Sequence, residues 1–188
     1  MGKVVVTEFV SVDGVFEDPG GAEGYEHGGW TFAYEGGADF FAFKSSELEA
    51  ADAQVLGRVT YEGFAAAWPE RRGDPFSDKF NSMPKYVVSS TLTDPAWENS
   101  TVIGTDLAVE IPKLKEKHEG EILVNGSGQL VRGLLAAGLA EEYRLMVFPV
   151  ILGTGKKLFG DEHASLTLAE SRPIGTDGIY LHVYRPRG

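Results

Sequence analysis

Small and hydroxylated residues follow four of the strand-like runs in this sequence. The clusters are Gly57-Arg58, Ser89-Ser90-Thr91, Gly104-Thr105 and Gly126-Ser127-Gly128. Such residues let backbone N–H groups approach an anion closely, and a helix N-terminus adds partial positive charge. Three of the four clusters lead toward a predicted helix. One cluster alone would be an ordinary strand-to-helix turn, but four together indicate an anionic ligand such as a nucleotide phosphate.

Arg58 strengthens this interpretation because it begins a predicted helix over residues 58–68. A cation at the positive end of a helix dipole costs about 0.3 kcal/mol or more. A phosphate bound between Arg58 and the helix would remove that cost. The alternative is an arginine whose side chain extends into solvent.

Asp39 is the most informative single acid in the sequence. It opens a predicted helix over residues 39–52, and Phe43 follows four residues later on the same side. A carboxylate beside an aromatic wall could bind the N–H edge of a planar heterocycle while the ring packs on Phe43. An acid that complements the helix dipole, next to a core phenylalanine, would give the same pattern.

Several common motifs are incomplete. The run Gly153-Thr154-Gly155-Lys156-Lys157 lacks the first glycine and the Ser/Thr of a phosphate-binding loop. Gly126 and Gly128 with Gly133 do not have the spacing of the dinucleotide fingerprint. The histidines are scattered without zinc-ligand spacing, so we predict no metal site. These absences disfavour a P-loop ATPase, a standard Rossmann dehydrogenase and a metalloenzyme.

Composition narrows the class of protein further. The chain has 188 residues, which indicates one domain over residues 1–188. Its formal net charge of −11 disfavours binding to nucleic acid or to an anionic membrane surface. No run approaches the ~18 apolar residues of a membrane span, and there is no signal-peptide pattern. With no cysteine, the chain fits a reducing compartment, and we expect a cytoplasmic protein.

The elements that must position these residues alternate between strands and helices. Predicted strands cover residues 3–10, 53–56, 85–90, 100–104 and 121–126, and predicted helices cover 39–52, 58–68, 106–118 and 128–138. The chain closes with three further strand-like runs. This order predicts an α/β fold with a mostly parallel sheet, helices on both faces and an antiparallel end. Ligands of such sheets bind beyond the carboxyl ends of the strands, where the four clusters lie.

Five motifs in order carry a family resemblance. They are Val12-Asp13-Gly14, the run 56–61, the run 85–91, the run 126–130 and the run 149–159. Together they resemble the dihydrofolate reductase superfamily, and more closely the reductase domain of bacterial riboflavin biosynthesis and its stand-alone relatives. The likeness covers nearly the whole chain. It implies an eight-stranded, mostly parallel sheet with an antiparallel C-terminal strand, and NADPH as the hydride donor.

The same resemblance implies roles for individual residues. The expected cofactor-binding residues are Asp13, Gly14, Gly57, Arg58, Thr60, Ser89, Ser90, Thr91, Gly126, Ser127, Gly128, Gln129 and Leu130. By this likeness Asp39 is the expected catalytic acid, while Trp30 and Phe43 are expected to bind the substrate. Trp30, Phe32 and Tyr34 belong to the long glycine-rich segment 11–36, which we expect to be a mobile loop that closes over the site.

The sequence and the resemblance together predict an NADPH-dependent reductase of a small planar heterocycle or imine, in a pterin- or aminopyrimidine-like class. Two alternatives remain open at this point. One is a nucleotide-binding module without turnover, and the other is a reductase that uses a flavin or deazaflavin. The resemblance also implies a homodimer.

Overall fold

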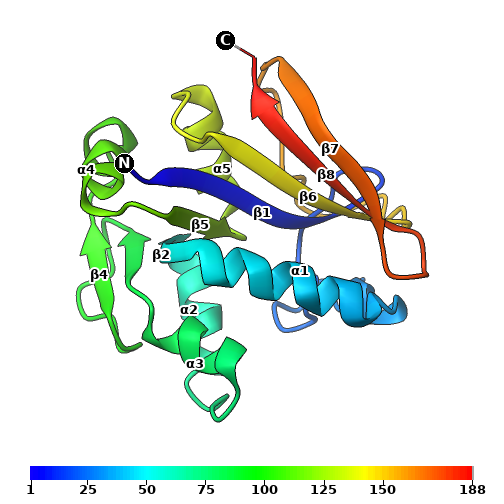
Figure 1. Cartoon of the computed structure of the whole chain (residues 1–188), viewed down its shortest axis with the longest axis horizontal. Helices are drawn as coiled ribbons and strands as arrows, with labels where there is room; N and C mark the ends of the chain where they lie inside the picture. The colour runs from blue at the N-terminus through cyan, green and yellow to red at the C-terminus, as the bar shows by residue number, and fades with distance from the viewer. Residues whose placement is uncertain (188) are drawn as a thin grey trace.

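A computed structural model describes residues 1–187, with a single sheet at its centre. The strands are β1 (Lys3–Ser11), β2 (Ala51–Gly57), β3 (Lys85–Val88), β4 (Ser100–Ile103), β5 (Glu121–Asn125), β6 (Glu142–Phe148), β7 (Leu166–Ile174) and β8 (Ile179–Pro186). They form an 8-stranded sheet in the order β4-β3-β2-β5-β1-β6-β8-β7, as Figure 1 shows.

Helices cover both faces of this sheet. They are α1 (Gly37–Ala50), α2 (Arg58–Ala67), α3 (Pro75–Ser82), α4 (Leu107–Lys117) and α5 (Gly128–Ala136), with a short 3-10 helix η1 (Trp30–Ala33) before α1. Residues of α1, α2 and α3 pack in one apolar cluster with the sheet, and residues of α4 and α5 pack in another. In Figure 1, α1 crosses the near side of the sheet. Within residues 1–187, no helix combines the length and the apolarity needed to span a bilayer.

The pairing of the strands confirms the predicted sheet. Every pair from β4 to β6 is parallel, because a helix or a long connection carries the chain back between successive strands. β8 is antiparallel to both β6 and β7, and it closes the chain as the expected antiparallel C-terminal strand. β1 lies centrally with Val4, Val5 and Val6 all buried, as expected of a strand covered on both faces.

One helix was not expected, and the bounds of the four expected helices differ from the prediction by one or two residues. α3 was not expected, although Asp74 accepts a hydrogen bond from the Ser77 N–H and Pro75 occupies its first position, both signals of a helix start. Its eight residues are too few and too polar to show a clear apolar period. α1 ends at Ala50 instead of residue 52, because Ala51 already pairs with β5 in the sheet.

The segment between β1 and α1 folds into a defined loop. The carboxylate of the buried Asp18 accepts hydrogen bonds from the backbone N–H groups of Ala22, Glu23 and Tyr25. The Tyr25 hydroxyl donates to the backbone carbonyl of Thr154 at 2.7 Å. This segment therefore lies against the connection that follows β6.

Candidate functional site

The carboxyl ends of β2 and β5 meet through a direct hydrogen bond. The Gly57 N–H donates to the Ser127 hydroxyl oxygen at 2.8 Å. Gly126 adopts a positive φ of 60°, and an added Cβ there would lie 2.9 Å from the Thr60 side chain. Glycine is therefore required at 126 both for its backbone angle and for the close approach of α2. Four of the expected cofactor residues, Gly57, Thr60, Gly126 and Ser127, lie together.

The N-termini of α2 and α5 both begin at this junction. Among the described residues, no side chain caps either helix, and neither carries an acid in its first turn. α3 shows the usual alternative, because its Asp74 side chain satisfies the first-turn N–H of Ser77 at 3.0 Å. The uncapped N–H groups of α2 and α5 are therefore available to acceptors from outside the helix, and an anion is one group that can accept from them.

The remaining residues of the 126–130 run contribute differently. Gly128 is buried, and the ring of Phe16 occupies the space where its Cβ would lie. Gln129 is exposed beside the junction, whereas the Leu130 side chain packs in the core. Only the backbone of Leu130 is therefore available to a ligand.

Arg58 and the loop after β3 lie at the same edge of the sheet. The Arg58 guanidinium contacts the Glu62 carboxylate at 2.8 Å, one turn along α2, and both side chains are about half exposed. Ser89 accepts hydrogen bonds from the backbone N–H groups of Thr91 and Leu92, which closes a tight turn. Ser90 and Thr91 are exposed at this turn, next to the end of β2.

Asp13 connects the loop after β1 to the segment after β6. Its carboxylate accepts hydrogen bonds from the Ser11 hydroxyl at 2.7 Å and from the N–H groups of Leu152 and Gly153 at 3.1 and 2.8 Å. These hydrogen bonds lower the pKa of Asp13 to about 2. The next residue, Gly14, has a φ of 82° and open space on its Cβ side. The carboxylate of Asp13 thus holds the loop, and the space on the Cβ side of Gly14 is open.

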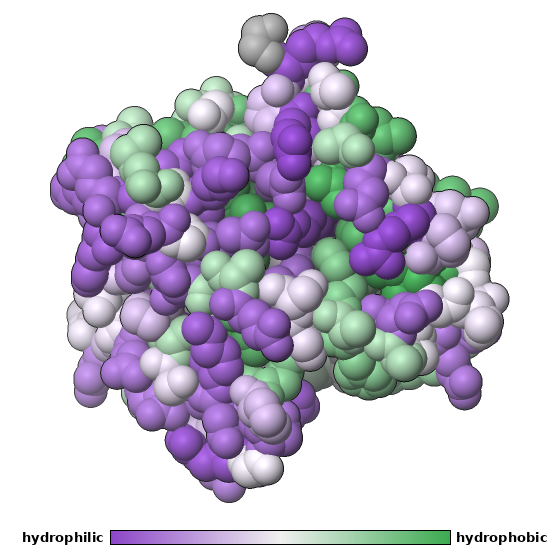
Figure 2. Space-filling model, viewed as in Figure 1, coloured by the Kyte–Doolittle hydropathy of each residue, from purple (hydrophilic) through white to green (hydrophobic). Residues whose placement is uncertain are grey.

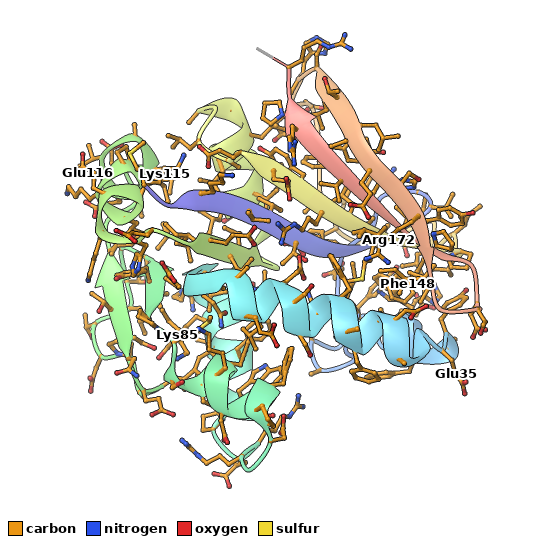
Figure 3. All side chains as sticks on the ribbon, in the orientation of Figure 1. Glu35, Lys85, Lys115, Glu116, Phe148 and Arg172 are labelled. Atoms are coloured by element: carbon orange, nitrogen blue, oxygen red, sulfur yellow. The ribbon has the colours of Figure 1, made fainter. Side chains whose placement is uncertain are left out.

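The three expected substrate residues differ in burial, and two of them share one apolar cluster. Trp30 is buried against Phe148, with ring centroids 5.3 Å apart, and its indole N–H donates to the Glu17 carbonyl. Phe43 packs on the same apolar cluster, and the Arg172 guanidinium lies 5.5 Å from its ring. Asp39 is exposed in the first turn of α1. Figure 3 labels Phe148 and Arg172 beside the N-terminal half of α1.

A buried charged network on the same face was not identified from the sequence. Lys44 donates to Glu47 at 2.6 Å and to the Thr7 hydroxyl at 3.1 Å, and the Glu47 side chain is 1% exposed. Arg144 contacts Glu47 at 3.4 Å and Glu121 at 2.6 Å. The signal in the sequence was the spacing: Glu47 follows Phe43 by four residues and Lys44 by three, which places all three near one side of the predicted helix.

Arg144 also lines a cavity of about 390 Å³ between α1 and strands β6, β7 and β8. Its charged side chains are paired within the chain: Arg144 with Glu121 and Glu142, Arg185 with Glu142, and Arg172 with Glu170. Figure 2 shows this side of the molecule, where hydrophilic residues gather near the centre. The cavity lies toward the amino ends of β5 and β6, away from the β2–β5 junction.

Glu8 is a second buried acid that the sequence reading missed. It is 5% exposed, and its Oε1 atom has no hydrogen-bond partner among the described residues. Burial raises the pKa of Glu8 well above its usual value, while the backbone N–H of Gly126 acts in the opposite direction. The Nδ2 atom of Asn125, the residue before Gly126, is also buried without a partner. The signal was a single acid between Val6 and Val10 in an otherwise apolar strand.

Two proteins of Bacillus subtilis are similar to this chain in sequence. The chain is 29% identical over 149 residues to the uncharacterized protein YyaP of Bacillus subtilis, covering 75% of this chain and 77% of that protein. It is 26% identical over 185 residues to the uncharacterized protein YwjB of the same organism, covering 97% and 98%.

Solved structures share the fold. A putative riboflavin biosynthesis protein from Shewanella sp. PV-4 superposes with a TM-score of 0.75 at 23% identity, over 99% of both chains. Dihydrofolate reductase from Enterococcus faecalis, complexed with NADP(H), gives 0.59 at 16% identity, over 100% of this chain and 98% of that one. A pyrimidine reductase-like protein from Corynebacterium diphtheriae gives 0.64 at 15% identity, over 100% of this chain and 92% of that one.

The family described as the RibD C-terminal domain matches residues 2–180. This match spans β1 to β7 and the first two residues of β8, and the fold agrees with it. The expected resemblance is confirmed: the fold is similar to that of dihydrofolate reductase, and the protein belongs to the RibD C-terminal domain family.

Proposed function

We propose that this protein is an NADPH-dependent reductase that transfers a hydride to a small planar heterocycle or imine of a pterin- or aminopyrimidine-like class. The observation that carries the proposal is the junction of β2 and β5. There the Gly57 N–H bonds Ser127, Gly126 lets Thr60 approach, and two uncapped helices begin. A cradle that an added Cβ would fill, between two helix N-termini, fits a dinucleotide diphosphate.

Different residues at this edge of the sheet would contact different parts of the cofactor. The first turns of α2 and α5 and the run 126–129 would bind the diphosphate. Arg58 and the turn at Ser89–Thr91 would bind the adenosine side with its 2′-phosphate. The loop carrying Asp13 and Gly14 would border the nicotinamide ring, and Phe16 would exclude water from the α5 end. Bound NADPH would supply the hydride.

On the substrate side, we propose that Asp39 orients the heterocycle and favours its protonation at nitrogen, directly or through water. Trp30 and Phe43 belong to one apolar cluster, and they would form the apolar wall against which the substrate ring packs. Asp39→Asn is expected to lower turnover about a hundredfold and NADPH affinity little, since a positioned acid contributes about 10²–10⁴-fold. Equal losses in both quantities would count against this role.

The deciding experiment is isothermal titration of the purified protein with NADPH, with NADH as the comparison. Micromolar binding that favours NADPH supports the proposal, and pterins and aminopyrimidines are then screened for oxidation of the cofactor. Arg58→Ala should weaken NADPH more than NADH if Arg58 contacts the 2′-phosphate. Absence of heat with both nucleotides contradicts the proposal, and an absorbance spectrum then tests for bound flavin. Binding without turnover of any screened compound would favour a nucleotide-binding module.

We also propose that the chain forms a homodimer. Leu168 and Tyr180 expose large apolar side chains on the β7–β8 pair, at the edge of the sheet. Light scattering during size-exclusion chromatography measures the mass directly, and a mass of 20.4 kDa would indicate a monomer.

A further inference from the structure

Two elements of the proposed 2′-phosphate region start side by side. In the register of β2 with β3, Gly57 pairs with Val88, so Arg58 and Ser89 directly follow paired residues. From there the chain continues into α2 on one side and into the segment 89–99 on the other. Arg58 belongs to the first element, and the turn that Ser89 opens belongs to the second. The spacing between α2 and this segment therefore determines how far apart the two groups lie.

One buried hydrogen bond joins the two elements. The Trp97 N–H donates to the Tyr61 hydroxyl oxygen at 2.9 Å, and the centroids of the two aromatic rings lie 6.2 Å apart. Tyr61 is 2% exposed and Trp97 is 3% exposed, so water has little access to this hydrogen bond. Tyr61 follows Arg58 by three residues, within one turn of α2. The hydrogen bond therefore acts on the same turn of α2 that carries Arg58.

Trp97 is also held from its other side. Its indole N–H donates to the Oδ1 atom of Asn81 at 2.8 Å, which joins it to α3. The ammonium group of Lys85, which Figure 3 labels, lies 4.2 Å from the centre of the indole. The same ammonium group donates to the carbonyl oxygens of Asn81, Met83 and Glu98, so all three of its N–H groups are used within the protein. Trp97 is therefore a fixed point, and α2 is positioned against it.

We propose that Tyr61 is a positioning residue that determines the preference for NADPH over NADH. This inference rests on the proposed function, in which Arg58 and the turn at Ser89 bind the 2′-phosphate. The Tyr61 hydroxyl holds α2 against Trp97, and so keeps Arg58 at the distance from the turn at which both can contact one phosphate. Charged hydrogen bonds to a phosphate need short distances of about 2.7–2.9 Å, so a small movement of α2 breaks them. NADH has a hydroxyl group in place of this phosphate, so its binding does not depend on that distance.

The first test compares two tyrosine-to-phenylalanine variants. Tyr61→Phe removes the hydroxyl group that accepts from Trp97 and keeps the aromatic ring. Tyr86→Phe is the matched control, because the buried Tyr86 hydroxyl also forms a hydrogen bond, at 3.0 Å to the Nε2 atom of His118. Tyr86 packs in the apolar cluster of α4 and α5, and Tyr61 packs in that of α1, α2 and α3. Isothermal titration measures the affinities for NADPH and NADH, and thermal unfolding of the free proteins reports the stability of each variant.

Two fragments of the cofactor show which part of it is affected. 2′,5′-ADP carries the adenosine with its 2′-phosphate, and 5′-AMP lacks that phosphate. Neither fragment contains nicotinamide, so their comparison isolates the adenosine side. Tyr61→Phe is expected to bind NADPH and 2′,5′-ADP about tenfold more weakly than wild type, which is the usual effect of losing one charged hydrogen bond. Its affinities for NADH and 5′-AMP should stay unchanged.

The control separates this role from a general loss of stability. Both variants lose a buried hydrogen bond, so both should unfold at a lower temperature than wild type. Tyr86→Phe is expected to keep the wild-type ratio of NADPH affinity to NADH affinity, whereas Tyr61→Phe should lower that ratio. A purely structural role of Tyr61 does not predict this difference.

A measurement on the wild-type protein is independent of both variants. If the hydrogen bond favours binding of the 2′-phosphate, the bound phosphate must stabilise the hydrogen bond to the same extent, because coupling between two sites is reciprocal. Hydrogen exchange of the Trp97 amide should therefore be slower with saturating 2′,5′-ADP than with saturating 5′-AMP. Equal exchange with the two fragments would contradict the inference.

Two further results would overturn the inference and leave the proposed function intact. In one, Tyr61→Phe keeps the wild-type ratio of NADPH affinity to NADH affinity. In the other, Tyr86→Phe lowers the ratio as much as Tyr61→Phe does, so that the loss of either buried hydroxyl group is sufficient. If the wild-type protein binds neither NADPH nor NADH, the proposed function fails, and this inference fails with it.

Discussion

Two buried glutamates, Glu47 in α1 and Glu8 in β1, have opposite surroundings. Glu47 is 2% exposed, and Lys44, Thr7 and Arg144 all contact its carboxylate. Glu8 is 5% exposed, and one of its carboxyl oxygens has no partner. The protein holds Glu47 as a compensated charge, which fixes α1 on the sheet. Glu8 follows the last residue of β1 that pairs with β5, and its Oε1 atom has no partner among the described residues.

This difference separates buried polar groups that stabilise the fold from those that are free to bind a ligand. A charge that is fully paired within the chain offers nothing to a ligand, however large the adjacent cavity, as at Arg144. A buried polar atom without a partner can still form a hydrogen bond, and a ligand can supply the missing partner. By this criterion Glu8 has unused hydrogen-bonding capacity, whereas the charged side chains around the cavity between α1 and β8 are paired within the chain.

Removing the central cation of the paired region should have the largest effect. Arg144→Met leaves the Glu121 carboxylate without its partner and the Glu47 carboxylate with Lys44 as its remaining cation, and an uncompensated buried charge typically costs about 3–5 kcal/mol. We expect the free energy of unfolding, measured with urea, to fall by this amount. Arg72→Met is the matched control, since the Arg72–Glu98 pair is exposed and should contribute about 1 kcal/mol or less. A loss no larger than that of the control would show that the network is dispensable.

A change at the cradle should affect binding more than stability. Gly126→Ala places a Cβ 2.9 Å from Thr60 at a φ of 60°, so the turn must move. We expect NADPH affinity to fall about tenfold, and the free energy of unfolding to fall by about 1–2 kcal/mol from strain. Gly138→Ala has the same positive φ with open space around it, so it should lose stability without losing affinity. Equal affinities for the two variants would contradict the cradle.

The unpaired state of Glu8 should appear as a pH dependence of stability. Its folded-state pKa is raised, so between the ordinary value near 4.3 and the raised value the native state binds more protons than the unfolded state. Stability from this group is therefore present at low pH and lost as pH rises, at most by about 1.4 kcal/mol per pH unit. Glu8→Gln does not titrate, and it should gain stability relative to wild type as pH rises. The free energy of unfolding of both proteins is measured with urea at several pH values, and a difference that stays constant with pH would contradict this prediction.

The smallest effect is expected at the loop anchor. The pKa of Asp13 is lowered to about 2 by its hydrogen bonds, so its contribution is present above the unfolded value near 4 and lost as pH falls toward 2. Asp13→Asn should slightly destabilise the protein at neutral pH, and this difference should shrink in acid. Urea midpoints of both proteins across the acid range measure it, and a constant difference would rule out the anchor role of the charge.

Much of the fold could be predicted from the order of elements. The alternation of β-branched runs with helical runs indicated a parallel sheet, and the strand-rich tail indicated its antiparallel end, because these patterns depend on local periodicity. α3 was missed because its signals are a capping residue and a proline, while its periodicity is too short to read. Glu8 and Glu47 were missed for a different reason. A buried charge is defined by what it contacts, and those contacts come from residues up to 97 positions away, as between Glu47 and Arg144.

The sequence by itself determined the family and the mostly parallel sheet, because each depends on short motifs and on the repeat of apolar residues, and the same motifs predict phosphate binding at the strand ends. Only the tertiary structure decided which acids are paired and which are free. It placed Thr60 against Gly126, Arg144 against Glu47, and Glu8 beside an open edge of β1. These relations arise from the strand order, which joins β5 to β1 and β2 across long stretches of chain, and hydrogen-bond partners follow from that order rather than from sequence spacing.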